Sequence, residues 1–185
     1  YLLMKTLSEK LPAGGTLGIV NPTFSEYERS SRLSGMSVYD FYLEEVHSHE
    51  ATSSFKINEV KIKEGLEKVD ALFICNPNNP TGTYESVENI RKFVAAIPKE
   101  TLVIIDEAYI DFVTSVAVPT ARALLDEFPN VAIMRTFSKA YGLANYRVGY
   151  MMTPIELANY MQTIRLPYNL NTLSQVAAEA AFGDQ

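Results

Sequence analysis

The sequence has little cysteine, little histidine and no long apolar stretch, and each scarcity narrows what the protein can be. Its single cysteine, Cys75, has no partner in the chain for a disulfide, which favours a reducing compartment such as the cytoplasm. Apolar runs such as residues 102–105 are far shorter than the ~18 residues that indicate a membrane span. Sixteen basic against 22 acidic residues give a net charge of −6, which argues against a surface that wraps nucleic acid.

Several common catalytic motifs are also missing. The chain has no Gly-Lys-Ser/Thr phosphate loop and no Gly-x-Gly-x-x-Gly dinucleotide fingerprint. It has neither the His-Glu-x-x-His of zinc proteases nor the Gly-x-Ser-x-Gly of serine hydrolases. The only histidines, His47 and His49, lie in a polar stretch at 44–54 that we expect to be an exposed loop. They lack a second set of strong ligands, so we predict no metal site.

What the sequence does contain is an alternation of short apolar runs with amphipathic segments. The runs predict buried strands at 17–20, 71–75, 102–105 and 131–134, with a weaker one at 147–152. The amphipathic segments predict helices at 25–33, 57–69, 87–97, 120–128, 155–164 and 172–182. Strands that are apolar on both faces are typical of a parallel sheet covered on both sides. We therefore predict one α/β domain over residues 1–185, a three-layer sandwich with a mostly parallel sheet.

The residues that follow three of these strands carry candidate chemistry. Ligands of an open α/β sheet bind beyond the carboxyl ends of its strands. An Asn-Pro-rich turn at 76–82, an Asp-Glu-Ala-Tyr segment at 106–109 and a Thr-Phe-Ser-Lys segment at 136–139 stand at these positions. Each alone has an ordinary explanation as a turn, a helix-capping acid or a solvated lysine. Their convergence on one sheet edge instead indicates a single site.

In combination these motifs are specific. The segments Asn-Asn-Pro-Thr-Gly, Asp-Glu-Ala-Tyr and Thr-Phe-Ser-Lys-Ala-Tyr-Gly-Leu, with Arg-Val-Gly-Tyr close behind, resemble the fold type I pyridoxal-phosphate-dependent aminotransferases of class I/II. The histidinol-phosphate aminotransferase branch is the most similar, and the resemblance covers nearly the whole chain. It implies the large domain of a pyridoxal 5'-phosphate (PLP)-dependent transferase. It also implies amino transfer from histidinol phosphate to 2-oxoglutarate in histidine biosynthesis.

The resemblance assigns roles around the cofactor ring. Lys139 would bind the cofactor aldehyde as a Schiff base and then shuttle a proton. Asp106 would face the pyridine nitrogen, where a carboxylate ~4 Å away is worth about 4 kcal/mol at intermediate dielectric. That attraction is ~3 pKa units, enough to favour the protonated ring. Tyr109 and Asn79 would donate to the phenolic oxygen of the ring, and Phe24 would stack on its face.

The resemblance also assigns partners for the cofactor phosphate. Thr136, Ser138 and Arg147 match the family's positions for this role, and arginine offers bidentate geometry. A departure lies just ahead of the arginine, where Asn145 and Tyr146 replace the usual glycine. Glycine permits backbone angles that asparagine reaches less often, so we expect the loop there to differ.

We expect the chain to be a fragment of a longer protein, because it opens at Tyr1 within a helical pattern. The family's amino-terminal arm, its phosphate-binding glycine turn and its carboxy-terminal small domain are not in the sequence. The fragment alone is expected to bind PLP poorly and not to turn over. The resemblance further implies a homodimer with its two sites at the subunit interface.

Two alternatives remain open. Threonine-phosphate decarboxylase shares this fold, although that enzyme tends to place threonine directly before the lysine, where this chain has Ser138. A non-catalytic PLP-binding regulator is the second alternative. Such regulators fuse this fold to a DNA-binding head, whose basic helical segment would precede Tyr1.

Overall fold

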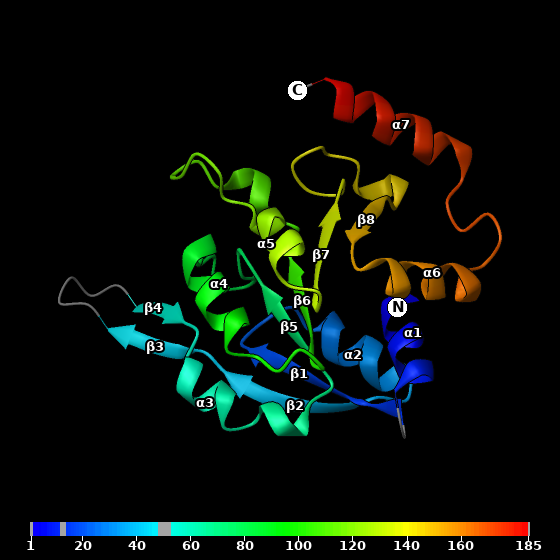
Figure 1. Ribbon diagram of the computed structural model, residues 1–185. Helices are drawn as coiled ribbons and strands as arrows, with labels where there is room; N and C mark the ends of the chain where they lie inside the picture. The colour runs from blue at the N-terminus through cyan, green and yellow to red at the C-terminus, as the bar shows by residue number, and fades with distance from the viewer. Residues whose placement is uncertain (1, 12–13, 48–52, 185) are drawn as a thin grey trace.

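The computed structural model describes residues 2–11, 14–47 and 53–184. The strands of its central sheet are β1 (Thr16–Asn21), β2 (Ser37–Tyr42), β5 (Ala71–Cys75), β6 (Leu102–Asp106), β7 (Val131–Thr136) and β8 (Gly149–Met152). They form one six-stranded sheet in the order β2-β1-β5-β6-β7-β8 (Figure 1). All neighbours pair parallel except β7 and β8, which pair antiparallel. The predicted α/β class with a mostly parallel sheet is confirmed.

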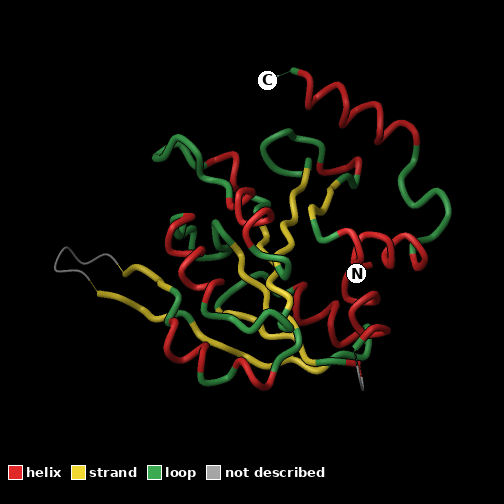
Figure 2. The backbone as a smooth tube through the Cα atoms, viewed as in Figure 1, coloured by secondary structure: helices red, strands yellow, loops and turns green. Residues whose placement is uncertain are grey.

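Helices cover both faces of the sheet and complete the three layers (Figures 1 and 2). On one face lie α3 (Glu59–Lys63), η2 (Leu66–Lys68), α4 (Val87–Ala95), η4 (Ala121–Ala123) and α5 (Leu124–Glu127). On the other lie α1 (Leu2–Lys10), α2 (Glu26–Leu33) and α6 (Ile155–Ile164). Two further short turns, η3 (Ile110–Phe112) and η5 (Ala144–Tyr146), and the last helix, α7 (Thr172–Gly183), lie at the edge of this arrangement.

The central strands are buried on both faces, as their composition predicts. In β5, Leu72 and Ile74 belong to the core cluster that contains the apolar side of α4. Phe73 between them belongs to the opposite cluster, with residues of α1 and α2. Successive side chains of a strand point to opposite faces, so an uninterrupted apolar run fills both cores at once.

The clearest predicted helix shows why its residues fold as they do. Ser86 caps α4, and its side chain accepts a hydrogen bond from the N–H of Asn89. Ile90, Phe93 and Val94 then share one face at helical spacing and are buried against the sheet.

Some expectations are wrong in detail. The segment 57–69 is not one helix but α3 followed by η2, and 120–128 is η4 followed by α5. β2 was not predicted, because its mixture of polar and aromatic residues lacks the buried-run signature: it is an edge strand in which only Phe41 is buried. The polar stretch 44–54 is only partly a loop. β3 (Glu44–His47) and β4 (Ser53–Lys56) pair antiparallel there, while His49 lies outside the described residues.

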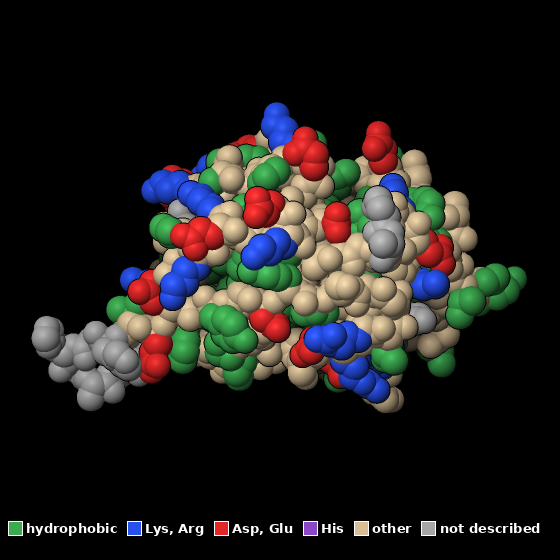
Figure 3. Space-filling model, turned by 90° about the horizontal axis from the view of Figure 1, so that it is seen from below, with side chains coloured by type: hydrophobic (Ala, Val, Ile, Leu, Met, Phe, Trp, Pro, Cys, Tyr) green, Lys and Arg blue, Asp and Glu red, His purple; other side chains and the backbone are tan. Residues whose placement is uncertain are grey.

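The surface of the described chain mixes charges of both signs. Figure 3 shows acidic and basic side chains interspersed over one face of the molecule. Among the described helices, none is both long enough and apolar enough to cross a membrane.

Candidate active site

The carboxyl ends of β5, β6 and β7 meet at one edge of the sheet, and a cavity of about 60 Å³ lies there. The residues that line it come from segments far apart in the sequence: Phe24, Tyr27, Cys75, Asn79, Asp106, Ala108, Tyr109 and Lys139. Five of the eight predicted site residues are thus brought together: Phe24, Asn79, Asp106, Tyr109 and Lys139. Parallel strands produce this convergence because they end at the same edge.

Asp106 is the last residue of β6 and is 8% exposed. One of its oxygens accepts a hydrogen bond from the hydroxyl of Tyr27 at 2.6 Å, and the other accepts from the N–H of Ala108 at 2.9 Å. Burial raises the pKa of Asp106, while these two hydrogen bonds and the charge of Lys139 act to lower it. A carboxylate can accept about four hydrogen bonds, so capacity remains for a donor in the cavity.

Lys139 extends from the turn after β7, and its side chain is exposed where it meets the cavity. Its Nζ lies 5.1 Å from the centre of the Tyr109 ring, which places a cation over an aromatic face. The ammonium also acts electrostatically on Asp106 across the cavity. An amine and a carboxylate therefore face one shared space, as the sequence predicts.

Asn79 and Tyr109 form a wall that this cavity shares with a larger one of about 390 Å³. The larger cavity is lined by Pro77, Asn78, Asn79, Pro80, Gly82, Tyr84, Tyr109, Phe112 and Val113. Its lining is mostly apolar and aromatic, with a few amide and hydroxyl groups, which is typical of a small-molecule site.

The turn after β5 is fixed by its own side chains. The amide of Asn78 donates to the carbonyl of Pro22 at 2.9 Å and to the hydroxyl of Thr81 at 2.8 Å. Its oxygen accepts from the hydroxyl of Thr23 at 3.0 Å. Asn78 thus ties the turn that carries Asn79 to the segment that carries Phe24.

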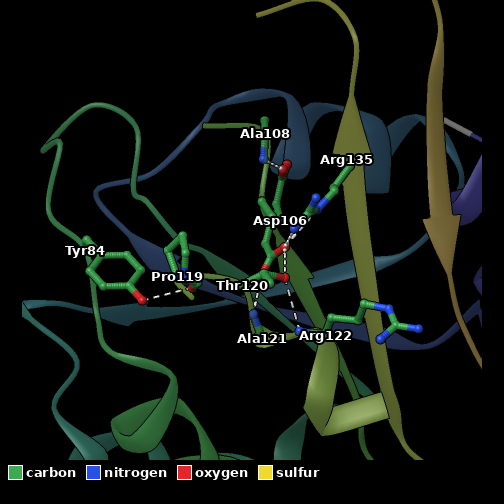
Figure 4. Close-up of polar contacts among 9 residues, drawn as sticks. Tyr84, Asp106, Ala108, Pro119, Thr120, Ala121, Arg122 and Arg135 are labelled. Carbon is green, nitrogen blue, oxygen red and sulfur yellow. Dashed lines mark hydrogen bonds and ion pairs between the residues drawn. The ribbon is translucent and has the colours of Figure 1, made fainter. Parts of the chain in front are cut away.

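A buried ion pair anchors the loop that follows β6. Glu107 is 1% exposed, and its carboxylate accepts two hydrogen bonds from the guanidinium of Arg135, at 2.9 and 3.0 Å. The same carboxylate accepts from the hydroxyl of Thr120 and the N–H of Ala121 (Figure 4). Both oxygens of this buried charge accept hydrogen bonds, which offsets the cost of burying the ion pair. The pair joins the end of β6 to β7 and to the segment before η4.

The predicted phosphate ligands lie apart from the cavity lining. The hydroxyl of Thr136 donates to the carbonyl of Val148 at 3.3 Å and accepts from the N–H of Ser138 at 3.0 Å. Arg147 is exposed, and its guanidinium donates to the carbonyl of Ala144 at 2.8 Å. These three residues stand at the β7–β8 end of the site, where the side chains of Thr136 and Arg147 donate to nearby backbone carbonyls.

The backbone at this end departs from ordinary geometry at an unexpected position. Arg147 itself adopts a φ of 57°, in the left-handed region. The strain falls on the arginine and not on Asn145 or Tyr146, the residues that replace the family's glycine.

The donor set fits PLP. The cavity offers an amine for an aldehyde, a carboxylate with free acceptor capacity for a ring nitrogen, and phenol and amide groups for the ring oxygen. Phe24, 43% exposed, offers an aromatic face at the cavity wall. The hydroxyls and the guanidinium at the β7–β8 end suit a phosphate.

Sequence reasoning missed Tyr27, Cys75 and Ala108 of the cavity lining, and it missed Glu107, which anchors the loop after β6. Tyr27 lies three positions after Phe24 at the start of α2, and such spacing places both on one side of a helical turn. Glu107 follows Asp106 directly, and alternation along the strand end points the two carboxylates in opposite directions.

The chain matches the family described as aminotransferase class I and II over residues 8–185. It is 48% identical over 167 residues to the histidinol-phosphate aminotransferase of Limosilactobacillus fermentum, covering 90% of this chain and 45% of that protein. The solved histidinol-phosphate aminotransferase of Sinorhizobium meliloti, in complex with pyridoxal-5'-phosphate, is similar with a TM-score of 0.80 at 26% identity, covering 99% of this chain and 48% of that one. The L-threonine-O-3-phosphate decarboxylase of Porphyromonas gingivalis has a TM-score of 0.76 at 22% identity, covering 97% and 49%, a likeness of fold alone. The chain therefore spans about half the length of the relatives it matches.

Proposed function

The chain belongs to the class I and II aminotransferase family, and from this premise we propose that the protein is a PLP-dependent aminotransferase. Its proposed amino donor is histidinol phosphate and its acceptor is 2-oxoglutarate, a reaction of histidine biosynthesis. The observation that carries the proposal is the cavity where Lys139 and Asp106 face the same space. The 48% identity to a histidinol-phosphate aminotransferase supports the choice of donor.

The proposal gives each side chain of the cavity one role. Lys139 holds the cofactor through its amine, and the same nitrogen takes and returns the proton at the substrate carbon that bears the amino group. Asp106 binds the protonated ring nitrogen. Asn79 and Tyr109 donate to the ring oxygen, and Phe24 covers the ring face. When bound, PLP supplies an electron sink for the substrate carbon.

The phosphate of the cofactor is assigned to the β7–β8 end of the site. Thr136 and Ser138 offer hydroxyls there, and Arg147 offers a guanidinium that can bind two phosphate oxygens. The bond to the carbonyl of Ala144 uses one of the five N–H donors of Arg147, so the others can serve the phosphate.

The organisation of the whole protein is proposed on the same basis. The described residues are one PLP-binding large domain, the protein is a cytoplasmic enzyme, and two copies form a homodimer. Large apolar side chains exposed near the end of the chain supply surface that an interface can bury: Leu166, Tyr168, Leu173, Val176 and Phe182. Sedimentation of the full-length protein tests the dimer.

A direct assay tests the activity. The full-length protein is incubated with histidinol phosphate and 2-oxoglutarate, and formation of glutamate is measured. We expect turnover that Lys139→Ala reduces by at least about 10²–10⁴-fold, because the amine that moves the proton is gone. Lys99→Ala is the matched control, because Lys99 is exposed before β6, at the other end of the strand, and should keep full activity.

Two further measurements, one with threonine phosphate as the substrate and one of PLP binding, separate the alternatives. Release of carbon dioxide from threonine phosphate without amino transfer would make the protein a decarboxylase. Binding of PLP with neither reaction would favour the regulator.

A further inference from the structure

Tyr27 contacts Asp106 although 79 residues separate them in the sequence. Its hydroxyl donates to Oδ2 of Asp106 at 2.6 Å, a short charge-assisted hydrogen bond. The residue is 5% exposed, so water does not compete for this contact. Tyr27 therefore contacts the carboxylate of Asp106 from the buried interior of the protein.

The ring of Tyr27 is fixed by aromatic packing on two sides. It stacks on Phe73 with ring centres 4.4 Å apart and an angle of 28° between the planes. Phe24 meets it edge-on at 5.6 Å and 86°. Such pairs restrict the ring beyond simple burial, so the hydroxyl has one position.

Both oxygens of Asp106 are held as a result. The N–H of Ala108 fixes Oδ1 and the phenol of Tyr27 fixes Oδ2, so the plane of the carboxylate is determined before any ligand arrives. A positive group in the cavity then meets an oriented partner, which lowers the cost of binding.

Four titratable groups besides Asp106 line this space: Tyr27, Cys75, Tyr109 and Lys139. Burial, with the charge of Asp106, raises the pKa of Tyr27 far above its ordinary value, so the phenol remains a donor at all physiological pH values. Burial, with the same charge, also raises the pKa of Cys75, so its thiol stays neutral. Tyr27 and Lys139 are the side chains that favour the ionised form of Asp106.

We propose that Tyr27 is a positioning residue of the catalytic site, which orients the Asp106 carboxylate toward the pyridinium nitrogen of the cofactor and stabilises its charge. This inference rests on the proposed function, because it names the device behind the carboxylate that binds the ring. The segment that leads into α2 then supplies two residues to the site. Phe24 would lie against the face of the cofactor ring, and Tyr27 lies behind Asp106, the carboxylate that would bind the ring nitrogen.

The test replaces Tyr27 by phenylalanine, which keeps the ring and its stacking and removes only the hydroxyl. In the full-length protein, Tyr27→Phe should weaken PLP binding about tenfold or more, measured by absorbance titration, since a hydrogen bond to a charged group is lost. Asp106 should protonate at a higher pH in the variant than in the parent. As the solution is acidified, the PLP affinity of the variant should therefore begin to fall at a higher pH than that of the parent. Tyr42→Phe, on an exposed tyrosine of β2, is the matched control and should change neither quantity.

Two further measurements separate positioning from packing. The ¹³C signal of the Asp106 carboxyl, titrated without PLP, should show its midpoint at higher pH in Tyr27→Phe than in the parent. In an Asp106→Asn background, the same tyrosine substitution should have little further effect on PLP affinity, because Tyr27 acts through the carboxylate.

The outcomes are distinct. A parent protein that binds no PLP would overturn the proposed function, while the ¹³C titration would still test the contact. A parent that binds PLP, with an unchanged affinity, pH profile and carboxyl midpoint in Tyr27→Phe, would overturn the role of Tyr27. Equal losses of affinity in both backgrounds would make the residue a packing element only.

Discussion

The two halves of the candidate site are built in different ways. Asp106, at the end of a central parallel strand, is buried, and each of its carboxylate oxygens accepts a hydrogen bond. Arg147, near the antiparallel edge of the sheet, is exposed, and its side chain is bonded to local backbone. The carboxylate is oriented before a ligand arrives, while the guanidinium of Arg147 is held by a bond to local backbone.

The difference follows from topology. Strands β5 and β6 have neighbours on both sides and helices on both faces, so the residues at their ends are held by the core. Strand β8 is an edge strand, and the segment before it packs only against a small cluster that includes Phe137, Val148 and Ala178. Asp106 therefore lies where core packing supports it from both faces, while Lys139 extends from the turn after β7 and is exposed.

The largest expected effect tests the ion pair between Glu107 and Arg135, which anchors the loop after Asp106. Glu107→Gln should destabilise the chain by about 3 kcal/mol or more, because it leaves the guanidinium of Arg135 without its buried counter-charge. Urea unfolding followed by circular dichroism measures this. Glu100→Gln, on an exposed carboxylate, is the control and should leave the transition unchanged. Equal stability of the two variants would show that the buried pair does not anchor this half.

A smaller effect is expected in the exposed half, on binding and not on stability. Arg147→Ala should weaken PLP binding by about 1.5–3 kcal/mol, the value of hydrogen bonds to a charged group, while the unfolding transition stays in place. Pyridoxal without its phosphate should bind the variant and the parent equally. Arg122→Ala, on another exposed arginine, serves as the control. Equal losses for PLP and pyridoxal would remove Arg147 from the phosphate site.

The smallest effect should come from the residue that covers the ring. Phe24→Leu keeps an apolar side chain but removes the aromatic face, which is worth about 0.5–1.5 kcal/mol. PLP affinity should fall a few-fold, as measured by absorbance titration. Tyr42→Leu, on an exposed ring of β2, should have no effect. A loss of PLP affinity larger than that of Arg147→Ala would mean that contacts to the ring contribute more to affinity than contacts to the phosphate.

The sequence predicts the central strands well because their residues are apolar on both faces, as Leu72, Phe73 and Ile74 illustrate. The same logic fails for β2, whose position at the edge leaves half of its side chains exposed. It fails again for the hairpin of β3 and β4, where a polar stretch pairs with itself.

The candidate site likewise contains residues that the sequence predicts and contacts that it does not. The strand-end rule brings Asn79, Asp106 and Lys139 together correctly, because it needs only the order and direction of the strands. The contact between Tyr27 and Asp106 depends on how α2 packs across the sheet, which no local pattern in the sequence encodes. The roles of the predicted site residues in binding PLP stay predictions for the experiments above.

The wall formed by Asn79 and Tyr109 has one more consequence. A molecule that enters the larger cavity touches the same two side chains that border the smaller one. Replacing Asn79 or Tyr109 so that the larger cavity accepts a different ligand would also change the hydrogen-bond donors that border the smaller cavity. A substitution in the wall formed by Asn79 and Tyr109 therefore changes the ligand selectivity of the larger cavity and the chemistry of the smaller one together.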